Sequence, residues 1–140
     1  MTDADRDRIL ALNLRAPIAL SSAAARAMIA SKRPGAIVNI ASAAAHAPAA
    51  GEAVYAAAKA GLVSFSHAAF AELREHNIKV CVVVPGLTDT ALIPANKRLK
   101  RELMLAPSYV ATAVMSVVES AARACPVEIA IQPQRDPMRS

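Results

Sequence analysis

Two short apolar runs, separated by a long alanine-rich stretch, constrain the fold most. Residues 36–41 read AIVNIA and residues 78–84 read IKVCVVV, and both are typical of strands buried on both faces. The stretch between them, from about Tyr55 to His76, is rich in alanine, which has the highest helix propensity. Strands that are joined through helices pair in parallel, with the helices on the faces of the sheet. The sequence therefore predicts an α/β fold.

The rest of the chain continues this alternation within one expected domain, residues 1–140. Thr2 or Asp3 can cap a first helix that runs towards Ser31, and Asn77 suits a left-handed residue at the end of the second helix. The remaining predicted elements are a short mobile helix over 91–105, a helix over 108–124 opened by Pro107, a third strand over 127–131 and a polar tail over 134–140.

A proline interrupts the first predicted helix. Pro17 has no N–H to donate to the carbonyl four residues before it, which belongs to Asn13. We therefore predict a local distortion that leaves the Asn13 carbonyl free for water or a side chain. The plain alternative is that bulk solvent satisfies this carbonyl.

Tyr55 and Lys59 stand four residues apart at the start of the alanine-rich helix. Residues at this spacing are neighbours on a helix surface, about 5–6 Å apart between Cβ atoms. A nearby ammonium favours the charged form of a phenol, and so does the positive end of the helix dipole. The pair could serve as a tuned proton donor and acceptor. Taken alone, however, a half-buried tyrosine beside a solvated lysine is the simpler interpretation.

The positions of other polar residues favour the catalytic interpretation. Ser42 follows the first predicted strand, and the loop over 85–90 follows the second. Sites in parallel α/β sheets lie at the carboxyl ends of strands. The start of the Tyr55 helix can lie beside this edge, so the three segments are expected to cluster there.

Composition excludes several other classes of protein. The formal charge is +5, but the basic cluster Lys97, Arg98, Lys100 and Arg101 lacks interleaved aromatic residues, so a nucleic-acid partner is disfavoured. The two cysteines, Cys81 and Cys125, lack metal-type spacing, and Cys81 is expected to be a buried free thiol. No apolar run is long enough to span a membrane, and no signal peptide is visible. We expect a cytoplasmic protein without metal.

Four sequence blocks together resemble the short-chain dehydrogenase/reductase family. They are NLRAP at 13–17, IVNIAS at 37–42, YAAAK at 55–59 and PGLTDT at 85–90, and EIAIQP at 128–133 resembles the family's last strand. The resemblance implies a partial Rossmann-like, doubly wound parallel sheet of about three strands with long flanking helices. It also implies hydride transfer between NAD(H) or NADP(H) and a small alcohol or carbonyl substrate.

The resemblance also implies roles for individual residues. Tyr55 would be the acid/base, Lys59 would depress the pKa of the tyrosine and bind the nicotinamide ribose, and Ser42 would hydrogen-bond the substrate oxygen. Asn13 would hold, through its carbonyl, a water that links Lys59 to solvent. The residues that would contact the cofactor are Tyr55, Lys59, Pro85, Gly86 and Thr90. Thr88 could also reach the cofactor, and capping of the loop is the equal alternative for its side chain.

The sequence departs from the family pattern at its beginning. The family's cofactor fingerprint is a glycine-rich turn, and Gly35, Gly51, Gly61 and Gly86, the four glycines of this sequence, form no such turn. We therefore expect a truncated or partial sequence whose first strand is an exposed edge, and which could be inactive alone. Three interpretations follow: an enzyme piece that needs a complementing amino-terminal segment, a non-catalytic module that forms homo-oligomers through its two long helices, or, with least support, a basic binding module around 97–101.

Overall fold

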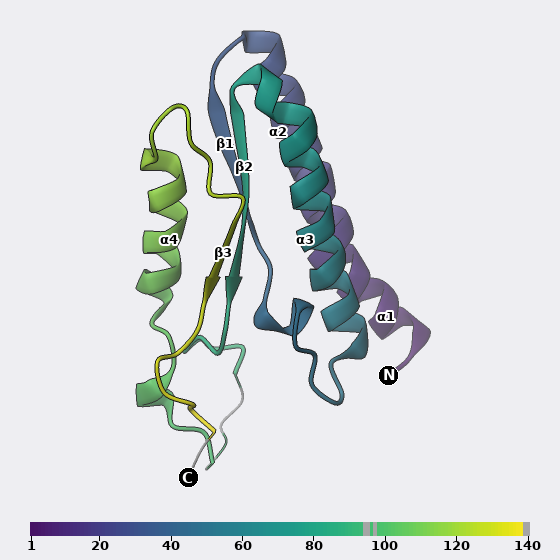
Figure 1. Cartoon of the computed structure of the whole chain (residues 1–140). Helices are drawn as coiled ribbons and strands as arrows, with labels where there is room; N and C mark the ends of the chain where they lie inside the picture. Colours follow the sequence, from purple (N-terminus) through teal and green to yellow (C-terminus); the bar gives the residue numbers. More distant parts are fainter. Residues whose placement is uncertain (94–95, 97, 139–140) are drawn as a thin grey trace.

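The computed structural model describes residues 1–93, 96 and 98–138 and confirms the parallel α/β architecture. The sheet order is β1-β2-β3, and both neighbouring pairs are parallel. Helices α2 and α3 lie side by side on one face of the sheet, and α4 covers the other face (Figure 1). The strands are β1 (Gly35–Ile40), β2 (Ile78–Pro85) and β3 (Glu128–Ile131).

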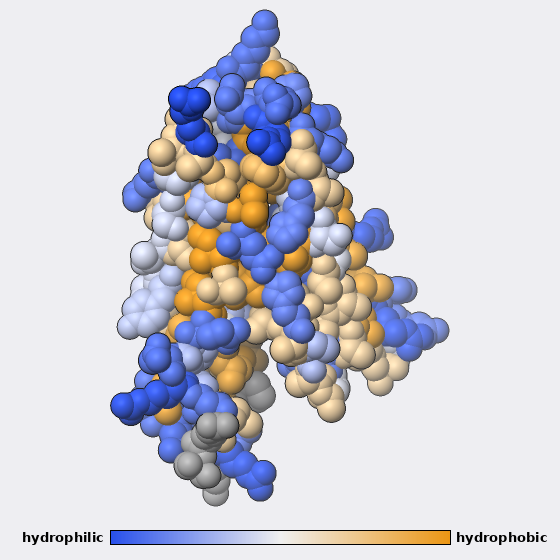
Figure 2. Space-filling view, in the orientation of Figure 1, coloured by the Kyte–Doolittle hydropathy of each residue, from blue (hydrophilic) through white to orange (hydrophobic). Residues whose placement is uncertain are grey.

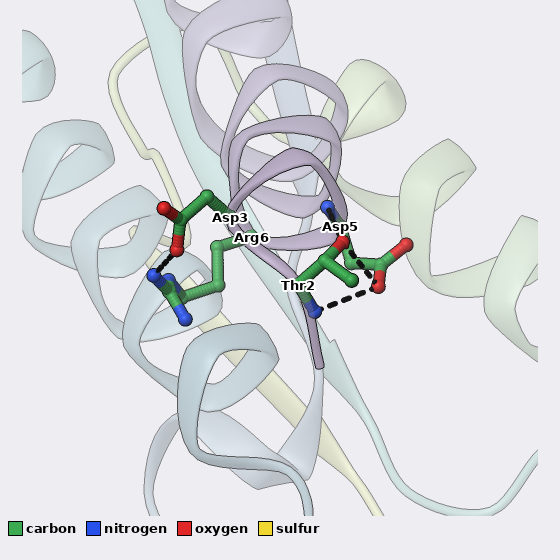
Figure 3. Close-up of polar contacts among 4 residues, drawn as sticks. All are labelled: Thr2, Asp3, Asp5 and Arg6. Carbon is green, nitrogen blue, oxygen red and sulfur yellow. Dashed lines mark hydrogen bonds and ion pairs between the residues drawn. The ribbon is translucent and has the colours of Figure 1, made fainter.

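The first helical run begins with a hydrogen-bonded cap. The Thr2 side chain accepts from the Asp5 N–H, and the Asp5 carboxylate accepts from the Thr2 N–H at 2.9 Å, which together form a capping box (Figure 3). The Thr2 backbone hydrogen bond, followed by the Thr2 hydroxyl, holds the pKa of the Asp5 carboxyl below its usual value. Asp3, in the same turn, forms an ion pair with Arg6. The expected cap is thus confirmed, and α1 runs over Asp3–Leu10.

The predicted distortion before Pro17 is also confirmed. A π-helical turn, Ala11–Arg15, separates α1 from α2, which spans Ala16–Ser31 with Pro17 in its first turn. The Ala16 N–H donates to the Ala11 carbonyl, five residues back, so the ladder widens just before the proline. The helical run therefore continues from α1 into α2, but its α-helical hydrogen-bond pattern is interrupted between them.

Helix α3 (Ala53–Leu73) ends in a short 3₁₀ turn, Arg74–His76, and then in Asn77 with φ 57°. Asn77 was predicted as the left-handed residue at the end of this helix. A Cβ added at Gly61 would lie 3.2 Å from the Leu14 side chain, so this glycine allows the π-helical turn to pack closely against α3. The two long helical runs are therefore in direct contact.

Strand β2 forms the centre of the core. Val80, Val82 and Val83 have no exposed surface, because β1 and β3 flank the strand while α3 and α4 cover its faces. Cys81 is equally buried, and its thiol is free, as expected. Burial raises the pKa of this thiol to about 11.

The first strand is less buried than its apolar sequence suggested. Ile37 and Asn39 are buried, but Ile40 is 39% exposed, so the expectation of burial on both faces is wrong for β1. Ile40 is exposed because β1 lies at the edge of the sheet, which confirms the prediction of an exposed edge strand. Its buried polar residue has partners, since Asn39 accepts from Ser21 at 3.2 Å and donates to Ser66 at 3.0 Å.

The segment after β2 differs from the prediction. In place of a short helix over 91–105, the described residues there form only a 3₁₀ turn, Arg101–Leu103, and residues 94, 95 and 97 lie outside the described part. Parallel bridging between Thr88 and Leu105 holds the two ends of this segment together instead. Helix α4 (Pro107–Glu119) begins at the expected proline but stops before Ala124, because Ser120 turns to an extended conformation.

The end of the chain is not wholly solvated. Pro137 is buried, and its carbonyl accepts from the Lys100 N–H at 3.0 Å. In the described part of the chain, no helix has the length and apolarity needed to cross a membrane.

Candidate functional site

The carboxyl ends of the strands, the start of α3 and the loop after β2 lie at the same end of the molecule (Figure 1). Ser42 stands just beyond β1, Pro85 ends β2, and Tyr55 is in the first turn of α3. The segments that carry the predicted site residues therefore meet at one edge of the sheet, as the parallel topology requires.

Lys59 contacts two of the segments that meet in this region. Its ammonium lies 5.7 Å from the centre of the Tyr55 ring and donates to the carbonyl of Ile40 at 2.9 Å. Lys59 is partly buried between these elements, and this burial lowers the pKa of its ammonium. A cation is thus held between the phenol and the end of β1.

Ser42 occupies the turn that follows β1. Its hydroxyl accepts from the Ala44 N–H at 3.2 Å and caps the 3₁₀ turn Ala43–Ala45. Because a hydroxyl has one proton to donate and two lone pairs, this bond leaves the Ser42 proton available to a second acceptor. The side chain is half-buried, which is compatible with a contact to a ligand.

Asn13 lies in the π-helical turn that packs against α3. Its side-chain amide donates to the Ile9 carbonyl at 3.0 Å, so the side chain itself is engaged within the helical run. The predicted water link runs through the Asn13 carbonyl to Lys59, whereas in this structure the Lys59 ammonium bonds Ile40. The role of Asn13 stays a prediction.

The loop after β2 is tied to the end of β3. The Gly86 N–H donates to the Ile131 carbonyl at 2.8 Å, and a Cβ at Gly86 would fall 2.2 Å from Oε1 of Gln132. A side chain at this position would therefore force the Gln132 side chain to move. The Thr88 hydroxyl donates to the Gly86 carbonyl at 3.0 Å, which orders the predicted cofactor loop from within.

Two other groups in this loop also have defined places. Thr90 is half-buried, and its carbonyl accepts from the Ile93 N–H at 3.2 Å. Asp89 forms an ion pair with Arg101. One member of the predicted basic cluster is therefore neutralised within the chain.

A second polar cluster was not predicted from the sequence. His46 and His67 are exposed and share one carboxylate: Glu128 lies 2.8 Å from Nε2 of His46 and 3.1 Å from Nε2 of His67. The three residues come from the loop after β1, from α3 and from β3. Hydrophilic residues interrupt the apolar band between α4 and α3 (Figure 2). Across the described ranges, no group of three His, Cys, Asp or Glu side chains could hold a metal ion.

Comparison with known proteins places this chain in a family. Residues 1–100 match the family described as short chain dehydrogenase, so the chain belongs to that family. A curated relative is a (3R)-3-hydroxyacyl-CoA dehydrogenase of Canis lupus familiaris, which is 36% identical over 92 residues. That match covers 66% of this chain and 36% of the relative.

Solved structures confirm the fold. The acetoin dehydrogenase of Enterobacter cloacae superimposes with a TM-score of 0.82 at 26% identity, over 98% of this chain and 60% of that one. A 4-hydroxyisoleucine dehydrogenase mutant complexed with NADH and succinate gives a TM-score of 0.82 at 26% identity, over 94% of this chain and 59% of that one. The chain thus spans only part of the length of its relatives, and the fold it shares with them is Rossmann-like.

Proposed function

We propose that this chain carries the proton-transfer half of an NAD(P)-dependent oxidoreductase that interconverts an alcohol and a carbonyl compound. The observation that supports this most is the position of Lys59, whose ammonium lies 5.7 Å from the Tyr55 ring beside the strand end that precedes Ser42. A cation in this position favours the phenolate, and a phenol that gains and loses a proton readily can act as general acid and base.

Each residue has a separate task in this proposal. During reduction, the Tyr55 hydroxyl gives its proton to the carbonyl oxygen while the carbonyl carbon receives a hydride. The Ser42 hydroxyl donates to the same oxygen and steadies its developing negative charge. Lys59 stabilises the phenolate that remains, and the Asn13 carbonyl holds a water through which Lys59 exchanges protons with solvent. Alcohol oxidation runs through the same steps in reverse.

The residues present fit the nicotinamide end of a dinucleotide. Pro85, Gly86, Thr88 and Thr90 would contact the carboxamide, and Tyr55 and Lys59 would contact the ribose. The bonds from the Gly86 N–H to the Ile131 carbonyl and from the Thr88 hydroxyl to the Gly86 carbonyl hold this loop in one conformation beside the strand ends, which would give the carboxamide a fixed wall. When bound, the nicotinamide supplies or accepts the hydride. None of the four glycines forms a phosphate-binding turn, so we propose that a complementing segment holds the rest of the dinucleotide and selects NAD or NADP.

Turnover and cofactor binding test this proposal together. NADH and NADPH are titrated into the 140-residue chain, alone and mixed with the amino-terminal part of a solved relative such as the acetoin dehydrogenase. We expect the mixture to oxidise or reduce members of a panel of small alcohols and ketones. Tyr55→Phe should lower kcat by about 10²–10⁴-fold with cofactor affinity nearly unchanged, since only the transferable proton is lost. Full activity of this variant would exclude Tyr55 as the proton donor.

A second candidate function is a non-catalytic module that pairs through its long helices. Exposed apolar residues on the first of these helical runs support it, namely Leu12, Leu20 and Ile29. Sedimentation of the chain at micromolar concentration separates the two proposals, because the module requires self-association without cofactor. Leu12→Ser should then abolish the dimer. In either case the proposed location is the cytoplasm, with no nucleic acid or membrane as a partner.

A further inference from the structure

An open pocket lies at the amino ends of β1 and β2, on the face of the sheet that α4 covers. Its volume is about 510 Å³, and it is formed by the turn after α2, the starts of both strands and the end of α4 with the residues that follow. In Figure 1 this is the end of the molecule where α2 stops, opposite the end that carries the candidate site. We call it the amino-end pocket.

Three basic side chains line the amino-end pocket from three segments. Lys32 follows α2, His76 belongs to the 3₁₀ turn before β2, and Lys79 is the second residue of β2. Lys32 and His76 are exposed, and within the described part of the chain their side chains have no hydrogen-bond or ion-pair partner. Their N–H groups are therefore available to a ligand.

Lys79 supplies a fixed positive charge to the same pocket. Its ammonium donates to the Ser120 carbonyl at 2.7 Å, to the Ser120 hydroxyl at 2.6 Å and to the Val117 carbonyl at 3.4 Å. These acceptors at the end of α4 hold the ammonium in place, and the negative end of the helix dipole stabilises it, but none of them carries a full negative charge. The positive charge of Lys79 therefore still acts on the pocket.

Carboxylates do not offset this charge inside the pocket. Among the described residues that line it, none is acidic. Glu75 precedes His76 but forms an ion pair with Arg74 at 3.8 Å, and Glu119, the last residue of α4, does not line the pocket. Hydrophilic residues gather at this end of the molecule (Figure 2). The pocket is thus a concave surface of positive potential, which attracts anions.

The remaining wall of the pocket is apolar. Pro34, Val118 and Ala122 line it, and Val118 is 51% exposed. A phosphoryl group carries up to two negative charges and three acceptor oxygens, which match two ammonium groups and an imidazole better than a single carboxylate does. We propose that the amino-end pocket binds a small phosphate ester, with its phosphoryl group at the three basic side chains and its apolar body against the end of α4.

This site goes beyond the proposed function, because it shares no residue with the candidate site, and its test needs neither cofactor nor turnover. The probe is phenyl phosphate, titrated into the 140-residue chain by isothermal titration calorimetry at low salt. We expect a Kd below about 1 mM. Phenol, which lacks the charge, should bind at least about tenfold more weakly. At about 1 M salt, where charges are screened within about 3 Å, the affinity for phenyl phosphate should fall several-fold.

Variants of the lysines test the position of the phosphoryl group. Lys32→Gln removes one charge and should weaken phenyl phosphate binding by about three- to tenfold. Lys79→Met removes the fixed charge and should weaken it by about tenfold, with circular dichroism and thermal unfolding to verify the fold. Lys100→Gln, at an exposed lysine of the loop after β2, is the matched control and should bind as the parent chain does.

A bulky substitution tests whether the ligand occupies the pocket. Ala122→Phe places a ring there without a change of charge and should weaken binding by about tenfold or more. Ala124→Phe is the matched control, because Ala124 is exposed in the same segment but does not line the pocket. Phenyl phosphate should also slow the reductive methylation of Lys32 several-fold, as followed by mass spectrometry, and leave that of Lys100 unchanged.

Any of four results would overturn the proposal, whatever the turnover of the chain. Absence of saturable binding would exclude the site, and phenol that binds as tightly as phenyl phosphate would show an apolar cavity without preference for anions. Equal affinities of Lys32→Gln, Lys79→Met and Lys100→Gln would exclude the basic side chains as the phosphoryl site. Equal affinities of Ala122→Phe and Ala124→Phe would place the ligand outside the pocket.

Discussion

Strands β1 and β2 have similar apolar sequences but very different surroundings. Val82 in β2 has no exposed surface, whereas Ile40 in β1 is 39% exposed. The difference comes from neighbours, since β2 pairs on both sides and β1 pairs only with β2. Apolar composition alone therefore does not distinguish a central strand from an edge strand.

The comparison also separates the core of the sheet from the candidate site. Strand β2 contributes the burial that holds the sheet, while β1 contributes the carbonyl bound by Lys59 and leads directly into Ser42. Exposed backbone groups at an edge can exchange partners, whereas those of a central strand are already paired. The candidate site thus includes the end of an edge strand, whose burial is lower than that of β2.

The largest expected effect is truncation in β2. Val82→Ala should lower the free energy of unfolding by about 2–4 kcal/mol, because it removes fully buried methyl groups and leaves a cavity. Ile40→Ala at the edge should lower it by less than about 1.5 kcal/mol, since that side chain is already partly in water. Urea unfolding measures both values. Equal losses would show that β1 is covered in solution.

Alkaline pH should lower the free energy of unfolding, because it ionises Cys81 in β2. Burial raises the pKa of this thiol from 9.0 to about 11, so its stabilisation is complete below pH 9.0 and is lost as the pH rises through about 11. Because one pKa unit corresponds to about 1.4 kcal/mol, the loss approaches about 2–3 kcal/mol. Urea unfolding of Cys81→Ala should lack this part of the alkaline decline. Cys125→Ala, at a half-buried thiol, should retain most of it, because the charge of Cys125 is a smaller cause of the raised Cys81 pKa than burial. An identical decline in all three proteins would refute the assignment.

Local patterns in the sequence predicted most of the fold. The helices and strands and several of their ends were predicted from local features, because each feature acts on residues nearby in the chain. These features are the alanine-rich and β-branched stretches and the residues Thr2, Pro17, Asn77 and Pro107. The segment over 91–105 was predicted wrongly, because the contacts that shape it, such as the Thr88–Leu105 bridge, join residues distant in sequence.

The same distinction holds for the candidate site, where a contact within one helix was predicted and contacts between elements were not. The spacing of Tyr55 and Lys59 predicted their proximity, since one helix carries both. The bond from Lys59 to Ile40 and the two histidine contacts of Glu128 could not be predicted, because they link separate elements. A residue pair within one helix is readable from spacing, whereas a pair between elements requires the packing itself.

A smaller effect is expected from the buried polar residue of β1. Asn39→Ala should lower the free energy of unfolding by about 1–3 kcal/mol, because it removes the side chain that accepts from Ser21 and donates to Ser66. Ser64→Ala, at an exposed position of α3, is the matched control and should change stability by less than about 0.5 kcal/mol. A neutral Asn39→Ala would mean that burial, as in β2, holds β1 without these bonds.

The smallest effect is expected where the loop after β1 meets β3. Glu128→Gln keeps the shape of the side chain but removes the charge that His46 and His67 share, and the contacts are partly exposed. The free energy of unfolding should therefore fall by only about 0.2–1 kcal/mol. Amide hydrogen exchange should show a larger local change, with faster exchange in residues 43–47, because His46 ends the 3₁₀ turn that Ser42 begins. Exchange that stays unchanged there would mean that Ser42 and the Ala44 N–H order this loop without help from β3, and the end of β1 would then be independent of the far edge of the sheet.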